Sequence, residues 1–336
     1  MRNKMLYLLG LLVLIVSCST ERNEVVVYCS LDKMYSEPVF KAFEEETGIV
    51  VKAVYDMELN KTVGLVNRLL AEGERPQCDV FWNNEISRTI MLMNKGLLTP
   101  YFSPEAADIP PAYKDTNGYW TGFAARARVI IYNKALPESY ELPASVLDLA
   151  NPKWKGKAAI AYPLFGTTAT HAAILFSKYG DKWAVEFFGA VKANDCGILD
   201  GNATVRDRVV SGDYWWGLTD TDDANGAIAD GKNVGIILPD QCTGCMGMPV
   251  IPNTVSLIGN APHSDNGKRL IDFILRPETE RQLAFARSAQ IPVRKGIPVP
   301  QNVIVLDSVK QMSVDYRKVC DRLDETAKTL GKLFVK

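Results

Sequence analysis

The sequence predicts an α/β fold in which short buried strands alternate with amphipathic helices. Apolar runs such as residues 24–28 and 79–82 are rich in β-branched or aromatic side chains and are typical of parallel strands buried on both faces. Polar turns and stretches with apolar residues at helical spacing follow them, which indicates a parallel sheet covered by helices. The chain has 336 residues, and a single hydrophobic core rarely forms from so many. We therefore expect two such units.

The first unit is predicted to begin with the strand at 24–28 and a helix that follows the polar segment Ser30-Leu31-Asp32. That helix has an apolar stripe at Val39, Phe40 and Phe43, and Gly48 stands where a glycine commonly ends a helix. The following elements are a strand at 49–54, a helix at 59–72, a strand at 79–82, the polar loop 83–85 and a helix at 86–95. Beyond this unit, another strand is predicted at 128–132.

The second part of the chain repeats the alternation. The proline- and glycine-rich stretch 242–252 is predicted to cross between the two units. We expect strands at 157–161, 214–218, 234–238 and 254–258, loops at 163–168 and 219–223, helices from Thr168 through Phe176 and at 202–210, 266–275 and 277–287, and a long final helix from about Val305.

The N-terminus carries an export signal. Arg2 and Lys4 precede an apolar run at 8–16, and Ser17 is followed by Cys18, which is the pattern of a lipoprotein signal cut before a cysteine that becomes lipidated. The alternative is a transmembrane anchor, but the run is too short to cross about 30 Å of hydrocarbon as a helix. We therefore predict a signal peptide at 1–17, a tether at 18–24 and a lipid-anchored periplasmic or cell-surface protein.

Composition and the absence of catalytic motifs limit the classes of function that the chain can have. The net charge of −1 gives no indication of nucleic-acid binding. We find no metalloprotease, nucleophile-elbow, P-loop or dinucleotide-binding motif, and the two histidines make general-base catalysis less favourable, so we predict a binding protein and not an enzyme. Cys242 and Cys245 are close enough to form a small disulfide-closed loop, although a redox motif is the alternative. The pairing of the exported cysteines is left open, and they are Cys29, Cys78, Cys196, Cys242, Cys245 and Cys320.

Several strings occur together, in an order typical of one known family. They are Val27-Tyr-Cys-Ser30, Phe43-Glu-Glu-Glu-Thr-Gly-Ile49, Asp79-Val-Phe-Trp-Asn-Asn-Glu85, Arg126-Ala-Arg-Val-Ile-Ile-Tyr-Asn133, Asn151-Pro-Lys-Trp-Lys-Gly156 and Ile251-Pro-Asn-Thr254. The chain resembles the substrate-binding lipoproteins of ABC importers, specifically the ferric-iron-binding branch of the type 2 periplasmic binding proteins.

This resemblance implies two α/β lobes that close over a solute through a hinge of two crossover strands. Lobe 1 would comprise 25–124 together with 255–336, and lobe 2 would comprise 125–254. The resemblance also implies delivery of the solute to an ABC permease in the inner membrane, and we expect a monomer. The alternatives are a secreted enzyme on the same fold and a sensor-type binding protein.

Ligands of open α/β sheets gather beyond the carboxyl ends of strands, near helix N-termini. Some of the candidate residues can have a structural role in place of ligand binding. A threonine can simply cap the helix after Gly166, and Arg126 and Arg128 can form ion pairs at the lobe boundary. His171 could reach the cleft, whereas His263 fits a surface loop. The predicted ligand-binding residues are Ser30, Asp32, Asn84, Glu85, Arg126, Gly166, Thr167, Thr168, Asp220, Thr221, Asp222 and Asp223.

The acidic segment 219–223 is where the sequence departs from the family. Members that hold ferric ion directly have adjacent tyrosines there, and this chain has three aspartates instead. Clustered unpaired carboxylates repel one another, so a cation, an amine or sugar hydroxyls would relieve them. Asp222 and Asp223 are therefore possible metal ligands for a transported Fe3+, and a sugar phosphate or phosphonate is the other candidate. Tyr28, Tyr35 and Tyr162 remain candidate phenolate donors.

Overall fold

A computed structural model describes residues 23–56, 63–137 and 139–334. The predicted signal peptide, Cys18 and nearly all of the tether lie outside the described residues, as does the start of the helix predicted at 59–72. Within the described ranges, no helix is long and apolar enough to span a membrane.

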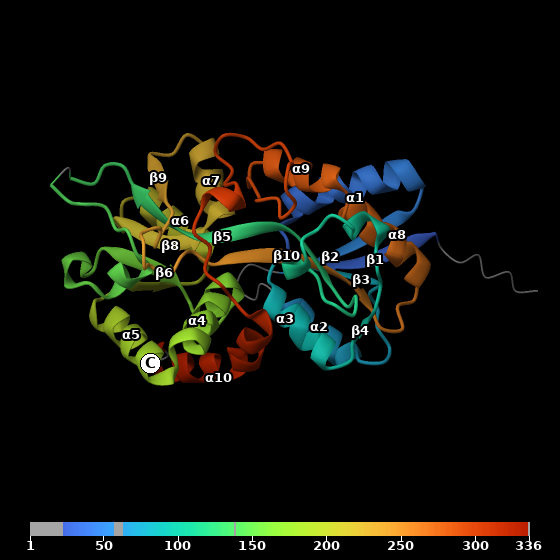
Figure 1. Cartoon of the computed structure of the whole chain (residues 1–336), viewed down its shortest axis with the longest axis horizontal. Helices are drawn as coiled ribbons and strands as arrows, with labels where there is room; N and C mark the ends of the chain where they lie inside the picture. The colour runs from blue at the N-terminus through green and yellow to red at the C-terminus, as the bar shows by residue number, and fades with distance from the viewer. Residues whose placement is uncertain (1–22, 57–62, 138, 335–336) are drawn as a thin grey trace, which may run out of the picture.

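The molecule is built on one ten-stranded mixed sheet, which confirms the predicted α/β class (Figure 1). Along the sheet the strand order is β2-β1-β3-β10-β5-β8-β6-β7, with β4 paired to β10 and β9 paired to β5. The strands are β1 Glu24–Cys29, β2 Val50–Tyr55, β3 Val80–Asn83, β4 Leu98–Thr99, β5 Thr121–Asn133, β6 Ala158–Ala161, β7 Gly197–Leu199, β8 Trp216–Asp220, β9 Val234–Ile237 and β10 Val250–Ile258.

Two long strands join the halves of the sheet. The first part of β5, from Thr121 to Ala127, pairs antiparallel with β10, whereas its second part, from Arg128 onward, pairs with β8 and β9. The pairing of β5 with β10 shifts register between Pro252 and Asn253. These two strands occupy the place of the predicted crossover strands, and the boundaries predicted at 124/125 and 254/255 remain predictions.

Helices cover both faces of the sheet. The C-terminal helix α10 contacts α4 and α5 of one half and α3 of the other, so it bridges the two halves (Figure 1). The α-helices are α1 Lys33–Thr47, α2 Gly64–Glu72, α3 Ile86–Asn94, α4 Gly166–Tyr179, α5 Asp181–Ala193, α6 Asn202–Val210, α7 Thr221–Ala229, α8 Ser264–Ile274, α9 Pro277–Phe285 and α10 Tyr316–Phe334; short 3-10 helices lie at Pro104–Ala106, Pro111–Tyr113, Val146–Ala150, Pro152–Trp154 and Leu306–Ser308.

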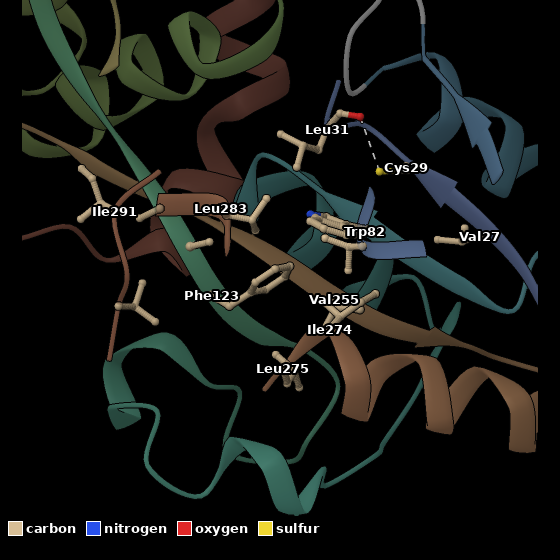
Figure 2. Packing of buried hydrophobic residues seen from close by; sticks show 14 of the residues in the cluster. Val27, Cys29, Leu31, Trp82, Phe123, Val255, Ile274, Leu275, Leu283 and Ile291 are labelled. Atoms are coloured by element: carbon tan, nitrogen blue, oxygen red, sulfur yellow. Dashed lines mark hydrogen bonds between the residues drawn. The ribbon is translucent and has the colours of Figure 1, made fainter. Parts of the chain in front are cut away.

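The core under the first half of the sheet is formed by side chains from sequentially distant strands. Figure 2 shows Trp82 of β3, Phe123 of β5 and Val255 of β10 gathered on one side of the sheet. The Trp82 and Phe123 ring centroids are 5.2 Å apart, and both side chains are fully buried. Each large aromatic contributes roughly 1.5–3 kcal/mol by leaving water, so this packing fixes the end of β3 and the adjacent start of the crossover strand.

Several predicted boundaries are wrong. Strand β5 begins at Thr121 and not at residue 128, and β10 begins at Val250 and not at residue 254. The final helix begins at Tyr316 and not near Val305, because the segment before it is drawn into extended pairing: the backbone N–H and C=O of Met248 bond to Lys310 and Met312. The predicted loop 219–223 is also wrong, since Asp220 ends β8 and Thr221 begins α7 directly. Acidic residues in a first helical turn are favoured by the positive end of the helix dipole.

The predicted disulfide-closed loop is present in the structure. Cys242 and Cys245 form a disulfide within the loop between β9 and β10. Burial raises the pKa of the Cys196 thiol to about 12 and also raises that of Cys78, which keeps both thiols protonated.

Candidate functional site

A cleft of about 260 Å³ opens at the carboxyl ends of parallel strands from both halves of the sheet. The segments after β1 and β3 line it from one half, and those after β6, β7 and β8 line it from the other, as strand polarity predicts. The lining residues are Asp32, Met34, Tyr35, Asn84, Arg126, Ala161, Tyr162, Phe165, Gly166, Thr167, Thr168, Asp200, Gly201, Asn202, Ala203, Arg206, Asp220, Asp222, Asp223, Gly226 and Arg287.

Most of the predicted ligand-binding residues line this cleft, but Ser30, Glu85 and Thr221 do not. Ser30 donates to Asp56 across 3.3 Å. The Glu85 carboxylate accepts from the first-turn N–H groups of α3 at 2.6 and 3.0 Å, so it is a helix cap. Thr221 Oγ1 accepts from a β5 backbone N–H at 3.2 Å. These three contacts hold the walls of the cleft in place.

The three clustered aspartates each have an arginine partner. The premise of unpaired carboxylates is therefore wrong, because the arginines offset their mutual repulsion without a bound cation. One oxygen from each of the three still lies within 4.8 Å of the others, which is a spacing that a metal ion could bridge. The pairs are Arg128–Asp220 at 2.7 Å, Arg126–Asp222 at 3.3 Å and Arg206–Asp223 at 3.4 Å.

Arg128 is the centre of a buried polar network. Its guanidinium donates to Thr167 at 3.3 Å, Thr168 at 3.1 Å, Asn202 at 3.0 Å and Asp220 at 2.7 Å, and its side chain is fully buried. The network therefore ties the starts of α4 and α6 to the end of β8. The ion-pair alternative for Arg128 is the one observed.

The threonine hydroxyls at the start of α4 point into this network. Thr167 Oγ1 donates to Asp220 at 2.5 Å and Thr168 Oγ1 bonds to Asn202 at 3.2 Å. Neither threonine caps the helix, because the residue before the first turn is Phe165 and makes no side-chain cap. Simple threonine capping is therefore excluded, and Gly166, Thr167 and Thr168 of this turn line the cleft.

Four helices of the described chain begin at the cleft without a side-chain cap. They are α1, α4, α6 and α7, whose preceding residues are Asp32, Phe165, Gly201 and Asp220. The first N–H groups of an α-helix have no acceptor within the helix, and the helix dipole places partial positive charge there. Together with Arg126 and Arg206 these ends form a region suited to an anion.

Several lining residues were not predicted from the sequence. Asn202 and Arg206 belong to a helix that was predicted, but β7 before it has only three residues and its carboxyl end was not recognised. Arg287 follows α9 of the other half and forms an ion pair with Asp230 after α7. No local pattern indicates that Arg287 returns to the cleft, because it is remote in sequence from every other lining residue.

Of the three candidate phenolate donors, Tyr35 and Tyr162 line the cleft and Tyr28 does not. Tyr35 lines the cleft, but burial and the nearby Asp222 carboxylate raise its pKa, which disfavours the phenolate. Tyr162 lines the cleft and stacks on Phe165 with centroids 6.2 Å apart. Tyr28 lies elsewhere, bonded to Glu72 at 2.5 Å.

Neither histidine lines the cleft. His171 is buried in α4, and burial together with the neighbouring Arg128 lowers its pKa to about 3, so the imidazole is neutral. His263 lies beside Asp79, with Nδ1 3.1 Å from the carboxylate.

Comparisons with known proteins agree with this architecture. A model of the family described as bacterial extracellular solute-binding proteins matches residues 39–305. The chain is 26% identical over 324 residues to iron uptake protein A1 of Synechocystis sp., covering 93% of this chain and 87% of that protein. It is 28% identical over 309 residues to a putative 2-aminoethylphosphonate-binding periplasmic protein of Salmonella typhimurium, covering 88% and 87%.

A solved structure supports the fold. Apo ferric ion-binding protein A of Pasteurella haemolytica superimposes with a TM-score of 0.82 at 24% identity, covering 94% of this chain and 100% of that one. The predicted periplasmic-binding-protein fold is thereby confirmed. The family consists of binding proteins, which agrees with the interpretation that the chain is not an enzyme.

Proposed function

Because the chain belongs to the bacterial extracellular solute-binding protein family, we propose that it captures a small phosphorylated or phosphonylated solute between its two halves. Delivery of that solute to an ABC permease in the inner membrane completes the proposed role. Fe3+ is the second candidate cargo.

The observation that carries the proposal is the anion-binding character of the second half of the cleft. The uncapped first turns of α4 and α6 line it at Gly166–Thr168 and Gly201–Ala203. Arg126 and Arg206 add two guanidinium groups to the same wall. Backbone N–H groups at helix N-termini combined with arginine side chains are the usual means by which proteins hold phosphate oxygens.

The other end of the cleft is suited to hydroxyl or amine groups. Asp32 and Asn84 line it from the first half, and both carry oxygen acceptors. Asn84 is buried, and its Oδ1 makes no hydrogen bond within the described residues. A solute with phosphate at one end and hydroxyls or an amine at the other matches both walls. One relative is named for such a solute, 2-aminoethylphosphonate, which has a phosphonate at one end and an amine at the other.

Ferric ion is favoured by one specific observation, the closeness of the three aspartate oxygens within 4.8 Å. Iron uptake protein A1 and the ferric ion-binding protein of P. haemolytica are similar proteins named for iron. Two features oppose this candidate: each aspartate has an arginine partner, and the raised pKa of Tyr35 disfavours phenolate ligation. We therefore rank it second.

A thermal-shift screen followed by calorimetry tests the proposal. The probes are glucose 6-phosphate, 2-aminoethylphosphonate, inorganic phosphate and ferric citrate, with glucose and citrate as matched controls. A ligand at 100 times its Kd stabilises the bound form by about 2.7 kcal/mol, so a phosphorylated probe should raise Tm where its unphosphorylated partner does not. A shift with ferric citrate alone would replace the first candidate with the second.

We also propose that Cys18 carries lipid and holds the protein near its permease as a monomer. The support is the sequence pattern around Ser17 and Cys18. Since the predicted tether is only 18–24, and an extended chain spans at most about 3.6 Å per residue, the cleft would stay within a few tens of ångströms of the bilayer.

A further inference from the structure

The crossover strand β5 contains a residue in an unusual backbone conformation. Ala124 has φ of +37°, a left-handed value that residues with a side chain rarely adopt. It lies where β5 and β10 shift register, between the pairs Ala125–Pro252 and Phe123–Asn253. Strained conformations persist only where surrounding contacts enforce them, and hinges absorb such changes in a few residues.

Two buried side chains hold Ala124 in this conformation. The Glu280 carboxylate of α9 accepts from the Ala124 N–H at 2.7 Å, and Asn253 of β10 donates through Nδ2 to the Ala124 carbonyl. Asn253 Nδ2 also donates to Gln290 at 2.8 Å. Ala124, Glu280, Asn253 and Gln290 are all fully buried, so water does not compete for these groups.

The same asparagine reaches the ligand cleft through Arg126. Arg126 Nη2 donates to Asn253 Oδ1 at 3.4 Å, and Nη1 lies 3.3 Å from Asp222. Among the described residues, Arg126 is the one residue of the two crossover strands that lines the cleft. Its Nε is buried without a hydrogen-bond partner in the described chain.

We propose that Asn253 is a positioning residue that couples the cleft to the hinge: its amide nitrogen fixes Ala124 while its amide oxygen orients Arg126 toward the ligand. The inference rests on the proposed function only for the identity of the ligand. It explains why the string Ile251-Pro-Asn-Thr254 bears a polar residue in the fully buried strand β10.

Asn253→Ala tests the proposal, with Thr254→Val as the matched control. Thr254 is the next residue of β10, is equally buried, and bonds to Thr89 at 2.7 Å. Among the described residues, its side chain has no hydrogen bond to Ala124 or Arg126. Both variants lose buried polar contacts, so both should lower Tm. Asn253→Ala should weaken binding of the tightest of glucose 6-phosphate, 2-aminoethylphosphonate and inorganic phosphate at least tenfold, whereas Thr254→Val should leave it unchanged.

A double-mutant cycle separates positioning from general damage. If Asn253 acts through Arg126, combining Asn253→Ala with Arg126→Gln should weaken binding no further than Arg126→Gln alone. Combining it with Arg206→Gln should multiply the two effects, because the hydrogen bonds of the Arg206 side chain go to Asp207 and Asp223 and not to Asn253. Multiplying effects in the Arg126 cycle would overturn the proposal.

Hydrogen exchange measured without ligand tests separately whether Asn253 fixes Ala124 in the hinge strand. Asn253→Ala should accelerate amide exchange in peptides covering residues 121–127 by at least tenfold, and Thr254→Val should not accelerate it there. Unchanged exchange in Asn253→Ala would overturn the inference whether or not any probe binds. If wild-type protein binds none of the three probes but the exchange result is positive, the proposed ligand class fails and the hinge role of Asn253 stands.

Discussion

Arg128 Nη1 lies 2.7 Å from Asp220 Oδ1, and both side chains are almost entirely withdrawn from solvent. Asp220 ends β8, while Arg128 is its direct partner in β5, so a register pair of the sheet is also an ion pair. Because Arg128 also holds the threonines at the start of α4, this one pair fixes the geometry of the wall that we propose binds an anion.

Removing one member of this pair should be strongly destabilising. Arg128→Met leaves the Asp220 carboxylate buried without its arginine, which typically costs about 3–5 kcal/mol. We expect that loss in urea unfolding, with a partial recovery in the double variant Arg128→Met with Asp220→Leu, which has no buried charge at this place. A single variant as stable as wild type would show that the pair is not needed to hold the wall.

His171 should make the protein sensitive to acid. Its folded pKa of about 3 lies below the ordinary value of 6.5, because burial and Arg128 oppose the charged form. Between pH 3 and pH 6.5 the unfolded chain therefore binds a proton that the folded chain does not. The contribution of His171 to the free energy of unfolding is fully present above pH 6.5 and is lost as the pH falls toward 3. The contribution approaches about 1.4 kcal/mol per pH unit.

His171→Leu should remove that contribution. Urea unfolding at pH 7 and pH 5 should show a smaller loss of stability in the variant than in wild type. Equal losses in the two proteins would mean that this imidazole does not govern the acid response.

Asp222→Asn distinguishes an anionic cargo from a metal. The carboxylate lies 3.3 Å from Arg126 and competes with any anion for that guanidinium. Neutralising it should strengthen inorganic phosphate binding by roughly 1 kcal/mol, about fivefold, as measured by calorimetry. Ferric binding should weaken by more than tenfold if Asp222 is a ligand. Weaker phosphate binding in the variant would argue against an anion beside Arg126.

Gly166→Ala probes the first turn of α4. Gly166 has φ of +55°, so alanine should cost about 1–3 kcal/mol in folding, and its methyl group would enter open space at a position that lines the cleft. We expect weaker binding of phosphorylated probes. Gly180, which follows the other end of α4 with φ of +82°, is the matched control: Gly180→Ala should cost similar stability and leave affinity unchanged.

Cys18→Ser tests the anchor. Lipidation adds acyl chains to Cys18, so mass spectrometry should find an acylated cysteine in the wild-type protein and no acyl group in the variant. Membrane fractionation does not decide this, because a variant that is not cut before residue 18 keeps the apolar segment 8–16. A wild-type protein without acyl groups would contradict lipidation at Cys18.

The fold was largely predictable because its signals are local. Apolar runs and helical spacing identified most strands and helices, and strand polarity placed the candidate loops on one edge of the sheet. Val305, Val309 and Met312 imitate helical spacing, yet a short 3-10 helix occupies Leu306–Ser308 and pairing with Met248 holds residues 310–312 extended. Tertiary contact overrode the local pattern there.

The charge balance of the site was not predictable in the same way. The aspartates at 220–223 were recognised, but two of their partners, Arg126 and Arg128, lie about 90 residues earlier and were assigned to a strand without a known neighbour. Only the register of β5 against β8 brings Arg128 to Asp220. Arg287 reaches the cleft from a still more distant segment.

The central claim is that the cleft takes a small phosphorylated or phosphonylated solute, and native mass spectrometry of the protein isolated from cells tests it most directly. We predict a bound small organic species that contains phosphorus and disappears on gentle unfolding. A protein that instead carries a single iron ion, with no organophosphorus compound, would contradict the claim.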